Sequence, residues 1–253
     1  MNLHNTVTAV ILAAGKGTRM KSELPKVAVV LNESPLLLHV LRNIESAGIE
    51  RKVVVVGYRK DIVTDIAKSF SGVEFAEQTE QLGTGHAVLS AESHLVPYSG
   101  YTIVACGDAP LISAKSFSEL IELHKSNGYS ATVLSAKMEN PTGYGRIIRS
   151  ADDGSLLRIV EEKDASPEEK VVSEVNTGTY CFNTDDLFTA LKQIGNDNAQ
   201  KEYYLTDVIK IFRSLGKKVG AKTLANALES HGINSPDDLA LAKQYIDKGL
   251  VGV

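Results

Sequence analysis

Two glycines and four nearby cations form the stretch of this sequence whose residue types could do chemistry. Gly15 and Gly17 follow a short apolar run, and the cations beside or after them are Lys16, Arg19, Lys21 and Lys26. Glycine permits a positive φ and a close approach of the backbone to a ligand, so such a loop can turn its N–H groups toward an anion. With cations next to it, the stretch predicts a phosphate-binding loop.

The spacing excludes two familiar phosphate loops. A Walker A loop requires Gly-x-x-x-x-Gly-Lys-Ser/Thr, whereas Gly15 and Gly17 are separated by Lys16 and followed by Thr18. The dinucleotide fingerprint needs a third small residue at the start of a helix, and Met20 stands at that position. The sequence therefore argues against a Walker-type nucleotidase and against NAD.

Asp108 is the candidate metal ligand. It follows an apolar strand expected over 101–106, so its carboxylate should stand at the carboxyl edge of a sheet and face the glycine loop. Mg²⁺ commonly takes carboxylate and phosphate oxygens together, so this placement predicts a Mg²⁺-assisted polyphosphate site. The six histidines show no HExxH spacing and no serine elbow of the GxSxG type occurs, so we assign the histidines no role and expect no covalent intermediate.

The elements around these residues alternate in type. Apolar strands are expected at 10–14, 53–56, 73–76 and 101–106, with helices between them and another helix at 113–127. Such alternation is typical of a doubly wound, mostly parallel α/β sheet, which binds ligands beyond the carboxyl ends of its strands. The glycine loop, Gln78, Gly83 and Asp108 all fall there.

In the second half of the chain the alternation of strands and helices stops. Strands expected at 131–137, 145–150 and 156–160 are joined only by turns, and Asp153-Gly154 is a hairpin signal. We therefore expect a small antiparallel excursion over the mouth of the sheet. Ser235-Pro236 followed by two aspartates predicts the start of a C-terminal helix.

Composition restricts the class of protein. The chain has 253 residues, of which 43% are hydrophobic and 23% charged, and it contains no apolar run near the ~18 residues of a membrane helix. No basic and apolar leader pattern begins it, so we expect a cytoplasmic protein with no membrane partner. Cys106 and Cys181 are far apart, which supports neither a disulfide nor a zinc site. A formal charge of −4 argues against nucleic acid as a partner.

Several motifs, taken together and in order, carry a family resemblance. They are LAAGKGTRM, LPK, AEQTEQLGTGHA, GDAPL, NPTGYGRI, IVEEKDA, EVNTG, NAQKEYYLTD and HGINSPDDLA. In content and spacing they resemble the sugar nucleotidyltransferases, and within that family the uridyltransferase domain of the bacterial N-acetylglucosamine-1-phosphate uridyltransferases. The resemblance implies a Rossmann-like, GT-A-like fold and the conversion of UTP and N-acetylglucosamine 1-phosphate to UDP-N-acetylglucosamine and pyrophosphate with Mg²⁺.

The resemblance also implies residue roles. The nucleotide-binding positions it matches are Leu12, Ala13, Gly15, Lys26, Gln78, Gly83 and Thr84, the last three on the uracil and ribose side. The phosphate-binding cations it matches are Arg19 and Lys26, which with Asp108 form the implied catalytic set. The implied metal ligands are Asp108 and Asn234, and the implied contacts to the acetamido sugar are Gly145, Glu161 and Asn176.

We expect one domain over 1–253, with a nucleotide-binding part at about 1–128, a sugar-binding part at about 129–234 and a helix at about 235–250. Two departures from the family are visible: Cys106 stands where members often have tyrosine, and no hexapeptide repeats follow as they do in the bifunctional members. A naturally single-activity protein and an excised domain both remain open.

Three functional hypotheses are compatible with the sequence. The first is the reaction implied above. The second is a relative that uses another nucleotide, another sugar or the galacto epimer, and the third is a non-catalytic nucleotide-binding module of the same fold. The sequence leaves the oligomeric state open.

Overall fold

The computed structural model describes residues 6–95 and 100–252. Its centre is strand β1 (Val7–Leu12), which pairs in parallel with β4 (Arg51–Val56) on one side and β6 (Tyr101–Cys106) on the other. Strand β5 (Val73–Glu77) extends the sheet in parallel beyond β4. Ala9, Val10 and Ile11 are fully buried, because both faces of β1 are covered and its uninterrupted apolar run suits that position.

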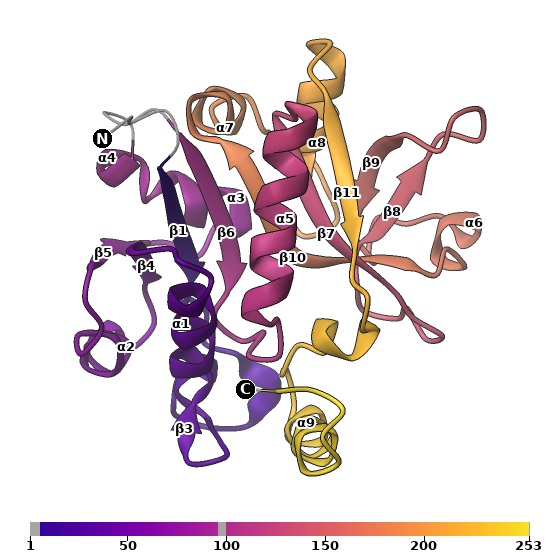
Figure 1. The fold of residues 1–253 in the computed structure, drawn as a ribbon. Helices are drawn as coiled ribbons and strands as arrows, with labels where there is room; N and C mark the ends of the chain where they lie inside the picture. Colours follow the sequence, from indigo (N-terminus) through magenta and orange to yellow (C-terminus); the bar gives the residue numbers. More distant parts are fainter. Residues whose placement is uncertain (1–5, 96–99, 253) are drawn as a thin grey trace.

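Helices cover both faces of this sheet (Figure 1). One face packs against α1 (Leu36–Ser46), α2 (Lys60–Ala67) and α5 (Ala114–Asn127), and the other against α3 (Thr84–Leu89), α7 (Thr184–Leu191) and α8 (Asp207–Ser214). Each face has its own apolar core, so the predicted doubly wound α/β architecture is confirmed.

The second half of the chain continues the same sheet before it departs from it. β10 (Glu174–Asn183) runs antiparallel between β6 and β7 (Ala131–Lys137), and β11 (Val219–Thr223) pairs in parallel with β7 at the edge. The placement of 131–137 in the antiparallel excursion was wrong. This strand is buried over its first six residues and is an interior strand of the main sheet, one position in from the edge strand β11.

The excursion consists of the hairpin β8 (Arg146–Arg149) and β9 (Leu156–Val160), which projects to the right in Figure 1. A bridge from Arg146 to Val175 of β10 attaches it to the sheet. The shorter described elements are α4 (Glu92–Leu95), α6 (Pro167–Lys170), the two-stranded hairpin β2 (Val30–Leu31) and β3 (Ser34–Pro35), and the 3₁₀ turns η2 (Thr18–Met20), η3 (Lys26–Ala28) and η4 (Ala227–Ser230).

A third, small apolar cluster lies apart from the two sheet cores. Helix α9 (Pro236–Asp247) contributes Ala242, and the cluster is completed by Met20, Leu111, Ile233 and two residues near the β2–β3 hairpin, Leu31 and Leu36. Met20 follows the glycine loop, Leu111 follows Asp108 and Ile233 precedes Asn234. The cluster therefore fastens together the three segments from which the ionic residues come.

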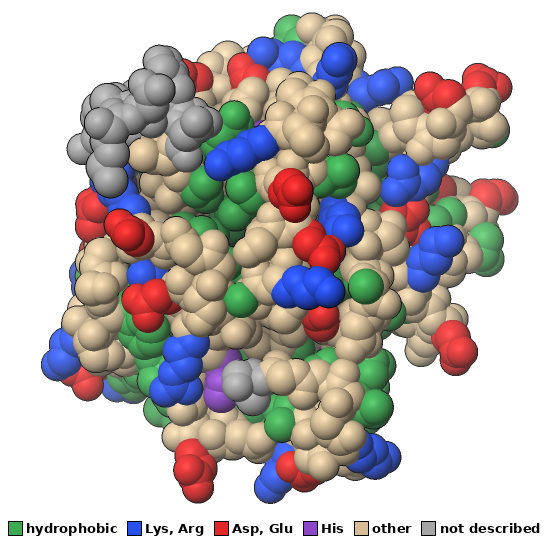
Figure 2. All heavy atoms as spheres, viewed as in Figure 1, with side chains coloured by type: hydrophobic (Ala, Val, Ile, Leu, Met, Phe, Trp, Pro, Cys, Tyr) green, Lys and Arg blue, Asp and Glu red, His purple; other side chains and the backbone are tan. Residues whose placement is uncertain are grey.

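Figure 2 shows acidic and basic side chains interspersed over one face of the molecule. Within the part of the chain that the structure describes, every helix is too short or too polar to cross a bilayer.

Candidate functional site

Four charged or amide side chains from distant parts of the chain meet at the carboxyl edge of the sheet. The Lys26 ammonium forms an ion pair with Oδ2 of Asp108 and donates a hydrogen bond of 2.9 Å to Oδ1 of Asn234. Arg19 donates to the same Oδ1 through Nη2 at 2.8 Å. The four residues predicted as phosphate-binding cations or metal ligands are thus linked in one chain of contacts, from Arg19 through Asn234 and Lys26 to Asp108.

The oxygen donors of this cluster fit a hard divalent cation. Asp108 and Asn234 both direct an oxygen at the Lys26 ammonium, so the two oxygens already converge on one small positive group. Among the described residues no three His, Cys, Asp or Glu side chains are grouped as metal ligands. One carboxylate and one amide oxygen, completed by phosphate oxygens and water, form a donor set of the kind that Mg²⁺ prefers.

Helix α9 holds Asn234 in place. Oδ2 of Asp238 accepts the Asn234 N–H at 3.0 Å and the Ser235 hydroxyl at 2.9 Å. The Ile233 N–H donates to the Asp108 carbonyl at 3.0 Å, which ties the two ligand-bearing segments to each other. Ser235 also caps α9 by accepting the Asp238 N–H, as the sequence predicts for this helix start.

The two glycines of the loop serve different purposes. Gly17 has a φ of +69°, and a Cβ at this position would lie 2.4 Å from Cβ of Lys26. Gly15 does not use the freedom that glycine permits: it is not among the positive-φ glycines, and a Cβ there would meet nothing within 4 Å. The missing side chain at Gly17 allows Lys26 to lie against the loop backbone, whereas the surroundings of Gly15 are open.

A cavity of about 270 Å³ extends from this cluster along the sheet edge. Eight of the predicted residues line it: Leu12, Ala13, Gly15, Lys26, Gln78, Gly83, Thr84 and Asp108. Arg19 and Asn234 line an adjoining hollow that shares Gly15 and Lys26 with the cavity. The cavity and the ionic cluster are thus parts of one continuous site.

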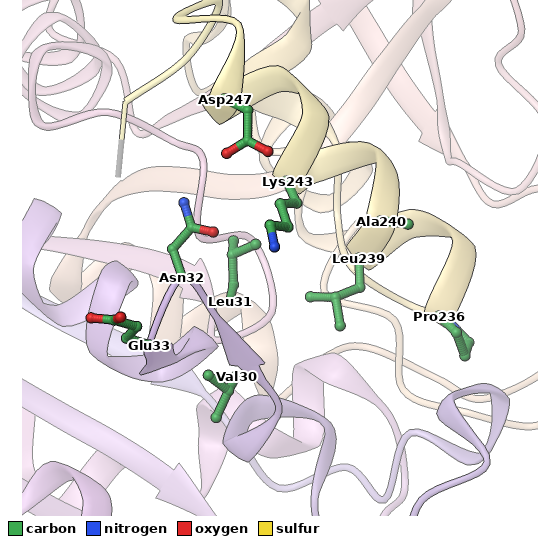
Figure 3. Close-up of a pocket in the computed structure, with 9 residues that line it drawn as sticks. All are labelled: Val30, Leu31, Asn32, Glu33, Pro236, Leu239, Ala240, Lys243 and Asp247. Atoms are coloured by element: carbon green, nitrogen blue, oxygen red, sulfur yellow. The ribbon is translucent and has the colours of Figure 1, made fainter.

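A larger hollow of about 670 Å³ lies elsewhere, between the β2–β3 turn and α9 (Figure 3). Lys243 and Asp247 extend into it from α9, and none of the predicted site residues lines it. The chemistry of the lining residues, and not the volume, therefore identifies the site.

The segment 198–206 packs beside the cavity, against the loop that carries Gly83 and Thr84. The Tyr203 N–H donates to the Leu82 carbonyl and its carbonyl accepts the Gly85 N–H, both at 2.8 Å, while the Leu205 N–H donates to the Thr84 hydroxyl at 3.1 Å. Glu202 of this segment lines the cavity. The motif NAQKEYYLTD indicates the family but predicts no role for its residues, because contact across more than a hundred residues leaves no local pattern.

Gln81 is a second residue that sequence reasoning missed. It lines both the cavity and the adjoining hollow, and its side-chain amide donates to the Gln78 carbonyl at 3.3 Å. Its place in the QLGTGHA motif was the available signal.

The three predicted sugar-binding residues also lie together. The Gly145 carbonyl accepts the Asn176 N–H at 2.8 Å, and a Cβ at Gly145 would lie 3.4 Å from a carboxylate oxygen of Glu161. Burial raises the pKa of Glu161, and the hydrogen bond of 3.1 Å from the Thr206 hydroxyl opposes that shift. The residues come from the starts and ends of β8, β9 and β10, so the hairpin is what assembles them.

Cys106 lines the same cavity, and its thiol lies 3.6 Å from the Gly178 carbonyl. Burial, and after it the negative charge of Asp108, raises the pKa of this thiol to about 12. The thiol is therefore neutral at physiological pH and is no nucleophile, since thiolates are the reactive form.

A doubly wound sheet with a cation-flanked glycine loop, a cavity and an acid–amide pair at its carboxyl edge defines the class of nucleotide-binding α/β proteins. The chain belongs to the nucleotidyl transferase family, whose model matches residues 8–226. Both the predicted family and the predicted fold class are confirmed.

Curated relatives support the assignment. The bifunctional protein GlmU of Oceanobacillus iheyensis is 50% identical over 240 residues, which are 95% of this chain and 52% of that protein. The protein of the same name from Streptococcus suis is 51% identical over 240 residues, with the same shares covered. The chain thus spans about half the length of the curated relatives it matches.

A solved structure shows the same fold. The crystal structure of UDP-glucose pyrophosphorylase complexed with UDP-glucose superposes with a TM-score of 0.76 at 18% sequence identity, covering 97% of this chain and 99% of that one.

Proposed function

We propose that this chain is a uridyltransferase that converts UTP and N-acetylglucosamine 1-phosphate to UDP-N-acetylglucosamine and pyrophosphate. The observation that carries the proposal is the cluster of Lys26, Arg19, Asp108 and Asn234 at the end of the nucleotide cavity. The family match and relatives that are about 50% identical support it. A role as a non-catalytic binding module would not require these four side chains together.

The reaction needs no general base. A phosphate monoester has a second pKa of about 6, so the sugar phosphate is mainly a dianion at neutral pH and its oxygen can attack the α-phosphorus directly. The new oxygen–phosphorus bond forms as the bond between the α-phosphorus and the bridging oxygen breaks, and the electron pair leaves with pyrophosphate. What the protein must overcome is repulsion between two anions.

Its charged side chains are placed for that task. Lys26 would hold the phosphates in line and neutralise charge that develops in the transition state, while Arg19 would bind the departing pyrophosphate. Gly17 keeps Lys26 in position through its positive φ and lack of a side chain. Asp108 and Asn234 would hold Mg²⁺, which when bound supplies a divalent charge that draws the phosphate groups together.

The remaining contacts divide the site between the two substrates. Backbone groups of Leu12, Ala13 and Gly15 would hold the nucleotide, with Gln78, Gly83 and Thr84 at the uracil and ribose. Gly145, Glu161 and Asn176 would bind the acetamido sugar. We accordingly propose one domain, with nucleotide binding at about 1–128, sugar binding at about 129–234 and a helix at about 235–250, acting in the cytoplasm.

Product analysis tests the proposal. Incubation with UTP, Mg²⁺ and N-acetylglucosamine 1-phosphate should yield pyrophosphate and UDP-sugar in equal amounts by ³¹P NMR. Parallel reactions with CTP, GTP, dTTP and the galacto epimer separate this reading from a relative with other substrates. UTP carrying sulfur on the α-phosphorus should give inverted configuration in the product, and retention would disprove direct attack. Absence of turnover with every pair would leave only the binding module.

A further inference from the structure

The side-chain amide of Gln78 is held by two hydrogen-bond acceptors. Gln78 is only 4% exposed, and its Nε2 lies 3.1 Å from the Gly83 carbonyl oxygen and 3.2 Å from Nδ1 of His86. A carbonyl oxygen can only accept, so the amide atom facing Gly83 must be the nitrogen. The orientation of the Gln78 amide is thereby fixed by the backbone.

This orientation determines the state of His86. Two hydrogens are available on Nε2 of Gln78; the Gly83 carbonyl takes one, and the other points to His86 Nδ1. Nδ1 must then carry a lone pair, which in the neutral ring places the proton on Nε2 of His86. His86 therefore accepts a hydrogen bond from Gln78 and reinforces the orientation set by Gly83.

The oxygen of the Gln78 amide is left for a ligand. No described residue donates a hydrogen bond to this oxygen. It is also not one of the fully buried side-chain atoms that lack a partner, which among the described residues are His39 Nδ1 and Thr179 Oγ1, so it is accessible from the cavity. Since Gln78 lines the nucleotide cavity, its Oε1 presents an acceptor there. A base edge with an N–H at the matching position satisfies that acceptor, whereas a base with a lone pair there leaves it unpaired.

We propose that His86 is a positioning residue for base selection: with Gly83 it locks the Gln78 amide so that the cavity accepts a base carrying a ring N–H. Uracil and thymine carry a hydrogen on N3, whereas N3 of cytosine is an acceptor. The inference rests on the proposed function, in which Gln78 faces the base. It goes beyond that function in naming a side chain that reinforces the orientation of the amide that the Gly83 carbonyl sets.

A matched pair of variants tests the lock. His86→Asn places a side-chain oxygen near the position of Nδ1 and keeps an acceptor, whereas His86→Leu has similar bulk without one. The ratio of kcat/KM for UTP to that for CTP should fall about fivefold in His86→Leu, the worth of one hydrogen bond of ordinary strength, and should change by less than about twofold in His86→Asn. A general loss of folding lowers both rates and leaves the ratio unchanged.

An independent measurement reports the tautomer. In the ¹⁵N spectrum of the full chain with labelled histidine, His86, assigned by its absence from His86→Asn, should show a bare Nδ1 and a protonated Nε2. The opposite tautomer would overturn the proposal. So would an unchanged UTP to CTP ratio in His86→Leu. If the wild-type protein makes no UDP-sugar at all, the proposed function fails. The ratio of the affinities for UTP and CTP, measured by calorimetry with the same variants, then still tests whether His86 orients the Gln78 amide.

Discussion

Substitution of Gly17 by alanine should separate backbone strain from the position of Lys26. A residue other than glycine at a φ of +69° loses about 1–2 kcal/mol of stability, and the new Cβ would lie 2.4 Å from Cβ of Lys26. Carbon atoms pack at about 3.5 Å or more, so the Lys26 backbone and side chain must move by roughly 1 Å. A displacement of that size in a positioning group costs about a hundredfold in rate.

Gly216 offers a matched control. It has a φ of +68°, and a Cβ there would meet no atom within 4 Å, so Gly216→Ala carries the strain without the displacement. Both variants should lose stability in thermal melts, Gly17→Ala at least as much as Gly216→Ala because of its added clash. In a pyrophosphate-release assay at saturating substrates, Gly17→Ala should lose about a hundredfold in kcat while Gly216→Ala keeps near-normal turnover. Equal turnover in the two variants would refute the reasoning that Gly17 exists to place Lys26.

Three further predictions concern the surroundings of the site. Asp238→Ala should raise the Mg²⁺ concentration for half-maximal turnover about tenfold because Asn234 loses its anchor, whereas Asp238→Asn keeps an acceptor and should stay near the wild-type value; no difference between them would contradict the anchoring role. Glu161→Gln should raise the melting temperature at neutral pH and weaken sugar binding. Burial raises the pKa of Glu161, so protonation of Glu161 stabilises the folded state; this stabilisation is fully present below about pH 4.5 and is lost as the pH rises. Since Gln resembles the protonated form, the higher melting temperature of Glu161→Gln should disappear in melts at low pH. Cys106, with a pKa of about 12, should resist alkylation by iodoacetamide at neutral pH in the folded protein, and fast labelling monitored by mass spectrometry would count against a neutral thiol.

Much of the site could be predicted because its parts follow strands. The apolar runs ending near Leu12 and Cys106 indicate buried parallel strands, and parallel strands bring their carboxyl ends to one edge. The meeting of Lys26 with Asp108 follows from that geometry. Asn234 followed from the family resemblance alone, since the apolar cluster that fastens α9 beside the loop is built from residues scattered over the chain.

The features that the sequence misplaced or did not show also have physical causes. The sequence pattern at 131–137 is that of one of several turn-connected strands, and only the pairing with β10 on one side and β11 on the other shows that it is an interior strand of the main sheet. Glycine permits a positive φ without requiring it, so the sequence could not separate Gly15 from Gly17. His86 carried no local signal, because its role depends on which atom of Gln78 faces it.

The central claim is that correctly positioned side-chain charges lower the barrier of the reaction, without a general base or a covalent intermediate. The turnover of Asp108→Asn tests this claim most directly. The substitution keeps the shape of the side chain and removes the negative charge that forms the ion pair with Lys26. We predict a loss of kcat of at least about a hundredfold, equivalent to roughly 3 kcal/mol, with the melting temperature little changed. Near-normal pyrophosphate release by Asp108→Asn at the same Mg²⁺ concentration would contradict the account.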